Sequence, residues 1–214
     1  GLGIPAVPLF RSRSDLILGN AAFISDIHVE PDMDQERVSV EAFFNNPRGY
    51  QSRLRILMKN PNGDVYEFFK DIKLEKENAT QKFLLGIKDW KKDKCVWSPE
   101  RPNLFAIEMQ LEIKGAKGKA PEYTFPVVKT FGFRKFDCLK GDYYINDSIV
   151  KLMGVSYNQQ WSEGGLWTDQ NPALEKDLNA VKAAGFNVIR SCGAPLSSTA
   201  LDICDRIGLF VFQE

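Results

Sequence analysis

The stretch Leu174-Glu-Lys-Asp-Leu-Asn-Ala-Val-Lys-Ala-Ala-Gly-Phe-Asn-Val-Ile-Arg190 places a helix directly before a strand and decides the fold of the C-terminal part. Apolar residues recur at a helical spacing, namely at Leu174, Leu178, Val181 and Ala184. Asn171-Pro172 is typical of a helix start, and Gly185 is typical of a C-terminal cap. The apolar run Phe186-Asn-Val-Ile-Arg190 then predicts a short, fully buried strand.

The same unit occurs again on both sides of this stretch. Ser197 or Ser198 is expected to cap a second helix, which runs through Arg206 and ends at Gly208. A strand is predicted over 209–212 after that helix, and another over 149–156 before the first helix. Strand–helix–strand–helix–strand with apolar strands indicates a parallel sheet. Three such strands leave an open edge, so we expect the sequence to be cut at Glu214.

The first 135 residues have a different pattern. Short runs alternate between apolar and polar residues and are separated by turn signals such as Asn60-Pro-Asn-Gly63. About seven strands are expected, over 23–30, 37–44, 52–58, 65–74, 81–87, 104–113 and 122–133. Alternation with a period of two predicts that each strand buries one face, as in a two-sheet β-sandwich.

Composition excludes several classes of function. The formal net charge is zero, whereas binding to nucleic acid or to an anionic membrane needs a basic excess. We therefore predict neither a nucleic-acid partner nor a membrane partner, and no apolar run is long enough for a transmembrane helix. The N-terminal residues do not resemble a signal peptide, because Pro5 and Pro8 interrupt them. The compartment stays open, with a periplasmic or secreted location favoured over the cytoplasm.

Metal and disulfide chemistry are not expected. The four cysteines form no Cys-x-x-Cys pair, and the one histidine, His28, alternates with Ile27 and Val29 and should face solvent. A zinc site needs clustered cysteine and histidine ligands, so no residue is predicted to bind a metal and no cofactor is expected.

Five segments, in order, resemble glycoside hydrolase family 2, the family of β-galactosidases, β-glucuronidases and β-mannosidases. They are Trp97-Ser-Pro-Glu-Arg-Pro-Asn-Leu-Phe105, Phe131-Gly-Phe-Arg134, Tyr144-Ile-Asn146 with Leu152-Met-Gly-Val155, Ala184-Gly-Phe-Asn-Val-Ile-Arg190, and Cys204-Asp-Arg-Ile-Gly-Leu-Phe-Val211. Residues 3–9 also look like the end of the jelly-roll domain that precedes these segments in the family. We expect the segment that begins at Trp97 to have a structural role, because a large buried ring can anchor the rim of a sandwich.

The resemblance implies a mixed fold: an immunoglobulin-like antiparallel β-sandwich, followed by the first three strands and two helices of a (β/α)8 TIM barrel. The expected divisions are 1–20 for the tail of a jelly-roll domain or linker, 21–136 for the sandwich, and 137–214 for the partial barrel. It further implies that the protein to which this chain belongs is a retaining β-glycosidase. Among the family's specificities, that of a β-galactosidase is favoured. The expected partners are a β-linked glycoside substrate and the remaining domains of the same enzyme.

Barrel active sites form at the carboxyl ends of the strands. Six residues there or in the next loop are candidates for binding substrate: Arg190, Asn158, Tyr157, Glu214, Trp161 and Trp167. Four of them have a structural alternative. Arg190 and Glu214 could form rim contacts, and the two tryptophans could pack the loop onto the sandwich. Gly193 stands where the family often has a histidine, and Gln159 follows Asn158 where the family has a glutamate, which puts galactosidase-type contacts in doubt.

No catalytic residue is assigned. By resemblance, the two catalytic glutamates stand at the ends of strands four and seven, beyond this sequence, so the chain alone is predicted to be inactive. A rival hypothesis is a non-catalytic immunoglobulin-like module that binds carbohydrate or protein. That hypothesis predicts no ordered structure after residue 140. A second rival is a degenerate, inactive relative of the enzymes.

Overall fold

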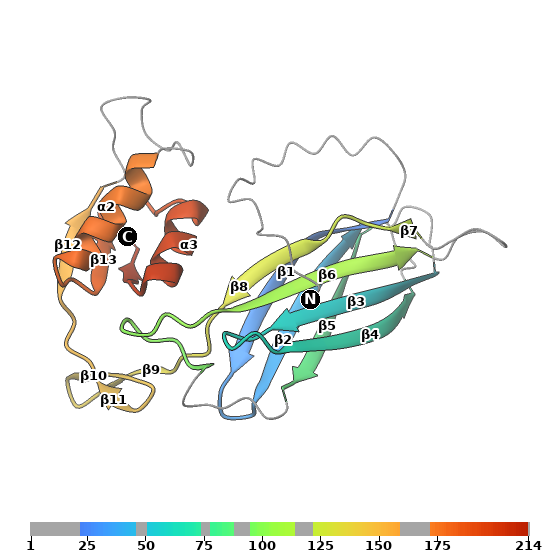
Figure 1. Ribbon diagram of the computed structural model, residues 1–214, viewed down its shortest axis with the longest axis horizontal. Helices are drawn as coiled ribbons and strands as arrows, with labels where there is room; N and C mark the ends of the chain where they lie inside the picture. The colour runs from blue at the N-terminus through green and yellow to red at the C-terminus, as the bar shows by residue number, and fades with distance from the viewer. Residues whose placement is uncertain are drawn as a thin grey trace.

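The computed structural model describes residues 22–45, 51–73, 78–87, 95–113, 122–158 and 172–213. The chain folds into an antiparallel β-sandwich and, beside it, a parallel sheet covered by two helices, with a small meander between them (Figure 1). The expected order of sandwich and then parallel sheet is therefore confirmed. The expected jelly-roll tail over 1–20 lies outside the described residues.

One sheet of the sandwich has the strand order β1-β2-β5. Its strands are β1 (Phe23–Asp32), β2 (Arg37–Asn45) and β5 (Asn78–Gly86), all antiparallel. The predicted alternation is visible in β2, where Val38, Val40, Ala42 and Phe44 are buried and the residues between them are not. A period of two therefore places one apolar face of this sheet against the other sheet.

The second sheet has the order β4-β3-β6-β7, and β8 also pairs with β6. Its strands are β3 (Gln51–Lys59), β4 (Val65–Lys73), β6 (Phe105–Ile113), β7 (Glu122–Tyr123) and β8 (Val127–Phe131). The single strand predicted over 122–133 is wrong, because Thr124 and Pro126 divide it. The hydroxyl of Thr124 accepts a bond from the Leu111 N–H at 3.1 Å, and Pro126 has no N–H for the ladder.

The sandwich core lies between these two sheets. Its fully buried side chains include Leu54, Ile56, Met58, Ile107, Met109 and Leu111 from β3 and β6. Phe105, Phe131 and Phe133 pack on one another at the end nearest the parallel sheet, with ring centroids 5.1–5.7 Å apart. Burying each such side chain stabilises the fold by about 1.5–3 kcal/mol, so the sandwich has a core of its own.

A three-stranded meander, absent from the expected strands, follows the sandwich. It consists of β9 (Phe136–Leu139), β10 (Asp142–Ile145) and β11 (Ser148–Ile149). Both turns have two consecutive residues with positive φ: Lys140 and Gly141, then Asn146 and Asp147. Such two-residue turns match the twist of paired strands. The strand predicted over 149–156 is therefore divided, with Ile149 in β11 and Gly154 at the beginning of β12.

The parallel sheet has the order β12-β13-β14. Its strands are β12 (Gly154–Tyr157), β13 (Val188–Ser191) and β14 (Phe210–Phe212), and the helices are α2 (Pro172–Ala183) and α3 (Ser198–Ile207). The predicted caps are confirmed: the Ser197 side chain accepts from the Ala200 N–H, and Gly185 and Gly208 have φ of 89° and 79°. Order after residue 140 contradicts the expectation of the non-catalytic rival.

The Trp97 segment joins the sandwich to the helical part. Trp97 is fully buried, and its Nε1 donates a hydrogen bond to the main-chain oxygen of Asp205 in α3 at 2.7 Å. Its ring also meets Phe210 edge-on at 5.4 Å between centroids, and the Arg134 guanidinium lies 4.9 Å from the ring centroid. The expected structural role is therefore correct, and it extends beyond the sandwich rim to the barrel strands.

Candidate functional site

The carboxyl ends of β12, β13 and β14 meet at one edge of the parallel sheet. The register aligns Ser156 with Arg190 and Arg190 with Phe212. Asn187 fixes the amino ends, since its Oδ1 accepts from the Met153 N–H at 2.8 Å and its Nδ2 donates to the Lys151 oxygen at 2.9 Å. This edge is where parallel α/β folds bind their ligands.

The two faces of the sheet differ in chemistry. Helices α2 and α3 cover one face through a buried cluster that contains Leu174, Leu178, Ile189, Leu196 and Ile203. The opposite face lines a concavity of about 500 Å³ with Ser156, Val188, Arg190, Phe212 and Gln213. Since alternate residues of a strand point to opposite faces, Ser156 and Arg190 belong to the concave face.

Arg190 is the charged group of this concave face. It follows the buried Val188 and Ile189 on β13, and its own side chain is exposed. A guanidinium has five N–H donors and stays protonated at all relevant pH values. The position allows Arg190 to bind an acceptor oxygen or a carboxylate of a ligand that enters the concavity.

Tyr157 lies on the other face of the sheet. Its ring packs against the cluster beneath α2 and α3, and its hydroxyl is buried without a hydrogen-bond partner among the described residues. Burial first, and then the nearby Asp177 and Cys204, raise the pKa of this hydroxyl to about 12. The structure therefore does not bring Tyr157 together with Arg190, and the predicted sugar contact of Tyr157 gains no support.

The other predicted site residues fall into two groups. Asn158 is exposed and directly follows β12 at the rim, on a strand next to that of Arg190. Trp161, Trp167 and Glu214 lie outside the described residues. Of the six candidates, the described structure therefore places Arg190 and Asn158 at the rim.

Sequence reasoning did not select Ser156, Phe212 and Gln213 as candidates, although they line the concavity beside Arg190. The signal was the strand period: once Arg190 is assigned to the inner face, the parallel register assigns Ser156 and Phe212 to it as well. Gln213 follows the strand, and its Oε1 accepts a hydrogen bond from the Leu196 N–H at 3.1 Å. No sequence pattern indicates that bond, because it joins two rim segments.

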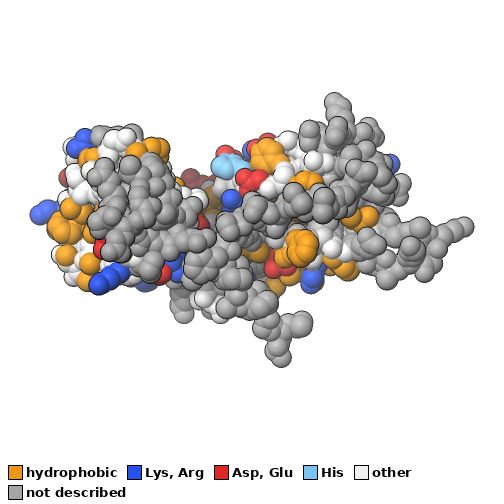
Figure 2. All heavy atoms as spheres, turned by 90° about the horizontal axis from the view of Figure 1, so that it is seen from above, with side chains coloured by type: hydrophobic (Ala, Val, Ile, Leu, Met, Phe, Trp, Pro, Cys, Tyr) orange, Lys and Arg blue, Asp and Glu red, His pale blue; other side chains and the backbone are white. Residues whose placement is uncertain are grey.

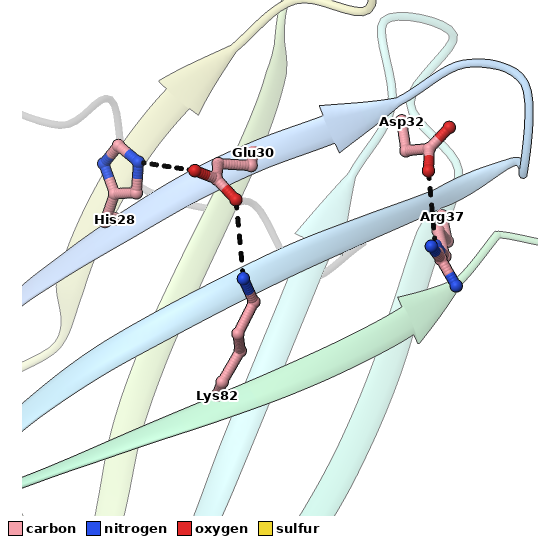
Figure 3. Close-up of polar contacts among 5 residues, drawn as sticks. All are labelled: His28, Glu30, Asp32, Arg37 and Lys82. Carbon is pink, nitrogen blue, oxygen red and sulfur yellow. Dashed lines mark hydrogen bonds and ion pairs between the residues drawn. The ribbon is translucent and has the colours of Figure 1, made fainter.

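His28 is exposed on β1, as expected. Its Nε2 lies 3.3 Å from Oε1 of Glu30, and the other carboxylate oxygen of Glu30 pairs with Lys82 (Figure 3). Basic and acidic side chains are interspersed on the face shown in Figure 2. Within the described ranges, no three His, Cys, Asp or Glu side chains come together as metal ligands. Neither of the described helices is long and apolar enough to cross a membrane.

The described rim lacks the groups that glycoside cleavage with retention requires. Over 154–158, 188–196 and 210–213 it offers the Arg190 guanidinium, amides and hydroxyls, and no carboxylate. Cleavage with retention needs two carboxyl groups roughly 5–5.5 Å apart. Within the described residues, this rim therefore offers hydrogen-bond donors and acceptors but not the pair of carboxyl groups.

Comparison with known proteins places this arrangement in a family. Residues 137–214 match the model described as "Glycosyl hydrolases family 2, TIM barrel domain". A putative β-glucuronidase of Formosa agariphila is 36% identical over 56% of this chain and 11% of its own length. A β-galactosidase of Thermoanaerobacterium thermosulfurigenes is 26% identical over 76% of this chain and 21% of its own. The chain thus spans about a tenth to a fifth of these two relatives.

Solved structures agree with this placement. A Bacteroides uniformis β-glucuronidase 2, covalently bound to cyclophellitol-6-carboxylate aziridine, superimposes with a TM-score of 0.70 at 25% identity, over 87% of this chain and 22% of that one. A β-galacturonidase from Eisenbergiella tayi shares the fold, with a TM-score of 0.69 at 22% identity, over 92% of this chain and 33% of that one. Sequence motifs, sandwich-to-barrel architecture and relatives agree: residues 137–214 belong to the TIM barrel domain of glycoside hydrolase family 2, and the preceding sandwich has the fold found beside that domain in the solved structures.

Proposed function

We propose that the protein to which this chain belongs is a retaining β-glycosidase that hydrolyses O-glycosidic bonds, and that this chain supplies one wall of its substrate site. The observation that carries the proposal is Arg190 on the concave face, at the carboxyl end of a parallel strand, within the part that matches the family's barrel. Nothing in this role needs a cofactor.

In the proposed mechanism, one carboxylate attacks the anomeric carbon while a second carboxylic acid protonates the leaving oxygen, and water then releases the sugar. The family resemblance assigns both groups to later strands. Arg190 and Asn158 act here as binding groups: each holds an oxygen of the sugar and thereby orients the bond to be cleaved. The relative with a covalently bound aziridine is consistent with a nucleophilic carboxylate.

The sugar is the open part of the proposal. We favour a β-galactoside, since several of the relatives are named β-galactosidase. Others are named β-glucuronidase, whose substrate would carry a carboxylate that the Arg190 guanidinium could bind in a bidentate manner. The two alternatives differ by one negative charge, which a substrate panel can resolve.

The test uses the full-length protein and the 214-residue chain side by side. Each is assayed against aryl β-galactoside, β-glucuronide, β-mannoside and β-glucoside. We expect the full-length protein to cleave at least one of them, and the isolated chain to cleave none because it lacks both carboxylates. Failure of the full-length protein on all four substrates would overturn the hydrolase proposal and favour the degenerate relative.

Retention is tested separately. Proton NMR of the first product should show the β-anomer before mutarotation, and a mechanism-based aziridine of the preferred sugar should add its mass to the full-length protein. An α-anomer as the first product would contradict the covalent mechanism and leave the hydrolase proposal standing.

A further inference from the structure

We propose that Gln213 is a positioning residue, which fastens the loop over 192–197 to the end of β14 and so keeps the substrate-facing rim beside Arg190 in one shape. The inference rests on the proposed function. Its observation is the 3.1 Å hydrogen bond from the main-chain N–H of Leu196 to Oε1 of Gln213. Leu196 precedes α3 and Gln213 follows β14, so this bond joins the two segments that form this part of the rim.

The loop is held at both ends by other contacts. At its beginning, the Ser191 hydroxyl donates to the Phe212 main-chain oxygen at 3.3 Å. At its end, the Ser197 hydroxyl accepts from the Ala200 N–H at 3.2 Å and caps α3. Between these ends, Gly193 adopts a φ of 79°, which favours glycine. Within the described residues, the Gln213 bond thus ties the loop's second half to the neighbouring strand.

The bond also pairs the main-chain N–H of a residue that is largely buried. Leu196 is buried, with 6% of its surface exposed, whereas Gln213 is exposed. A buried N–H that loses its acceptor must be left unpaired or must move toward solvent. Because the Leu196 side chain belongs to the cluster beneath α2 and α3, the loop main chain is the part that would move.

The loop's position matters for binding because the loop begins two residues after Arg190. Gln213 and Arg190 line the same concavity, so the fastened loop and the guanidinium border one space. A loosened loop would populate conformations that do not fit the substrate. The apparent affinity for substrate would then fall in proportion to the fraction of molecules in the binding-competent conformation. The proposed catalytic carboxyl groups lie outside this loop, so loosening the loop should change KM and leave kcat unchanged.

Two variants separate the bond from the bulk of the side chain. Gln213→Met keeps the length and removes the acceptor, whereas Gln213→Glu keeps an acceptor oxygen. The matched control is Gln110→Met in the sandwich, where the amide of Gln110 donates to the Thr124 oxygen at 2.8 Å far from the rim. All are made in the full-length protein, and their thermal midpoints are compared with the wild type.

We expect Gln213→Met to speed hydrogen exchange at the Leu196 amide by about three- to tenfold, the range for one lost hydrogen bond, and to raise KM by a similar factor with kcat within about twofold. Gln213→Glu, which keeps the acceptor oxygen, should restore the exchange rate, and Gln110→Met should alter neither value. Unchanged exchange in Gln213→Met would show that the bond does not hold the loop, and faster exchange with an unchanged KM would show that the loop does not shape the site. If the wild type cleaves no glycoside, the proposed function fails and exchange alone decides the fastening.

Discussion

The indole Nε1 of Trp97 donates a hydrogen bond to the main-chain oxygen of Asp205 at 2.7 Å, and this bond connects a sandwich loop to the C-terminal part of α3. The side chain of Asp205 lies 3.3 Å from the Arg134 guanidinium, which in turn covers the Trp97 ring. Lys182 of α2 donates to the oxygens of Pro99 and Gly208 at 2.7 and 2.8 Å. Hydrogen bonds therefore connect the loop at the end of the sandwich to both α2 and α3.

Replacing Trp97 with phenylalanine should lower the free energy of unfolding by about 2–3 kcal/mol. The change removes the donor to Asp205 and leaves a space beside the buried ring. Urea denaturation followed by circular dichroism measures the effect. His28→Ala is the control, because His28 is exposed and its pair with Glu30 is worth little. A Trp97→Phe variant as stable as His28→Ala would mean that the joint contributes no stability.

Replacing Gly208 with alanine should be more costly than replacing Gly185. Both residues end a helix with positive φ, so each alanine meets a backbone strain of about 1–2 kcal/mol. A Cβ at Gly185 meets no atom within 4 Å, whereas a Cβ at Gly208 would overlap the Pro99 main-chain oxygen. We expect Gly208→Ala to cost about 1–3 kcal/mol beyond Gly185→Ala. Equal midpoints in thermal unfolding would contradict the close contact between Pro99 and α3.

Tyr157 gives a pH-dependent prediction. The folded pKa of its hydroxyl is raised to about 12, whereas an unfolded tyrosine titrates near pH 10. Between these values the unfolded chain has released the proton and the folded chain has kept it, so ionisation of Tyr157 leaves the free energy of unfolding unchanged below about pH 10 and lowers it progressively toward pH 12. The free energies of unfolding of the wild type and of Tyr157→Phe are measured from pH 8 to 12. The wild type should lose stability relative to Tyr157→Phe as the pH rises from 10 to 12.

The same variant tests whether Tyr157 touches substrate. Its hydroxyl has no partner among the described residues and is buried, so removing it should leave stability at pH 7 unchanged or raise it by up to about 1 kcal/mol. With the ring on the helix side of the sheet, KM and kcat of the full-length protein should stay within about twofold of the wild type. A tenfold rise in KM would restore Tyr157 as a sugar contact.

The sequence allowed most strands to be placed, because their alternation reflects one buried face. Val38, Val40, Ala42 and Phe44 are buried and alternate with the less buried Ser39, Glu41 and Phe43, and this period of two can be recognised without knowing the turns. The meander was missed because its strands are two to four residues long, too short for a period to be visible. The dipeptides Lys140-Gly141 and Asn146-Asp147 were the available signals, since both turns need positive φ.

The candidate site was less predictable, because the end of a strand does not reveal which way a side chain points. Tyr157 and Arg190 both stand near strand ends, yet one lies beneath the helices and the other faces the concavity. The register that aligns Ser156 with Arg190 settles the difference, and register is a property of paired strands. The role of Gln213 depends on a contact with Leu196, which no local pattern encodes.

Arg190 carries the prediction on which the proposed function depends most directly. In the full-length protein, Arg190→Met should lower kcat/KM for the preferred glycoside by about 10²-fold or more, since a charge-assisted contact to the sugar is lost, and Arg190→Lys should recover only part of it because the bidentate fork is missing. Arg53→Met is the matched control, because Arg53 is exposed on β3 and covers the Phe69 ring in the sandwich. The free energy of unfolding is measured for every variant. If Arg190→Met were fully active, or were inactive only because it unfolds, the guanidinium would be a rim support; a large loss in kcat/KM with normal stability identifies it as a substrate contact.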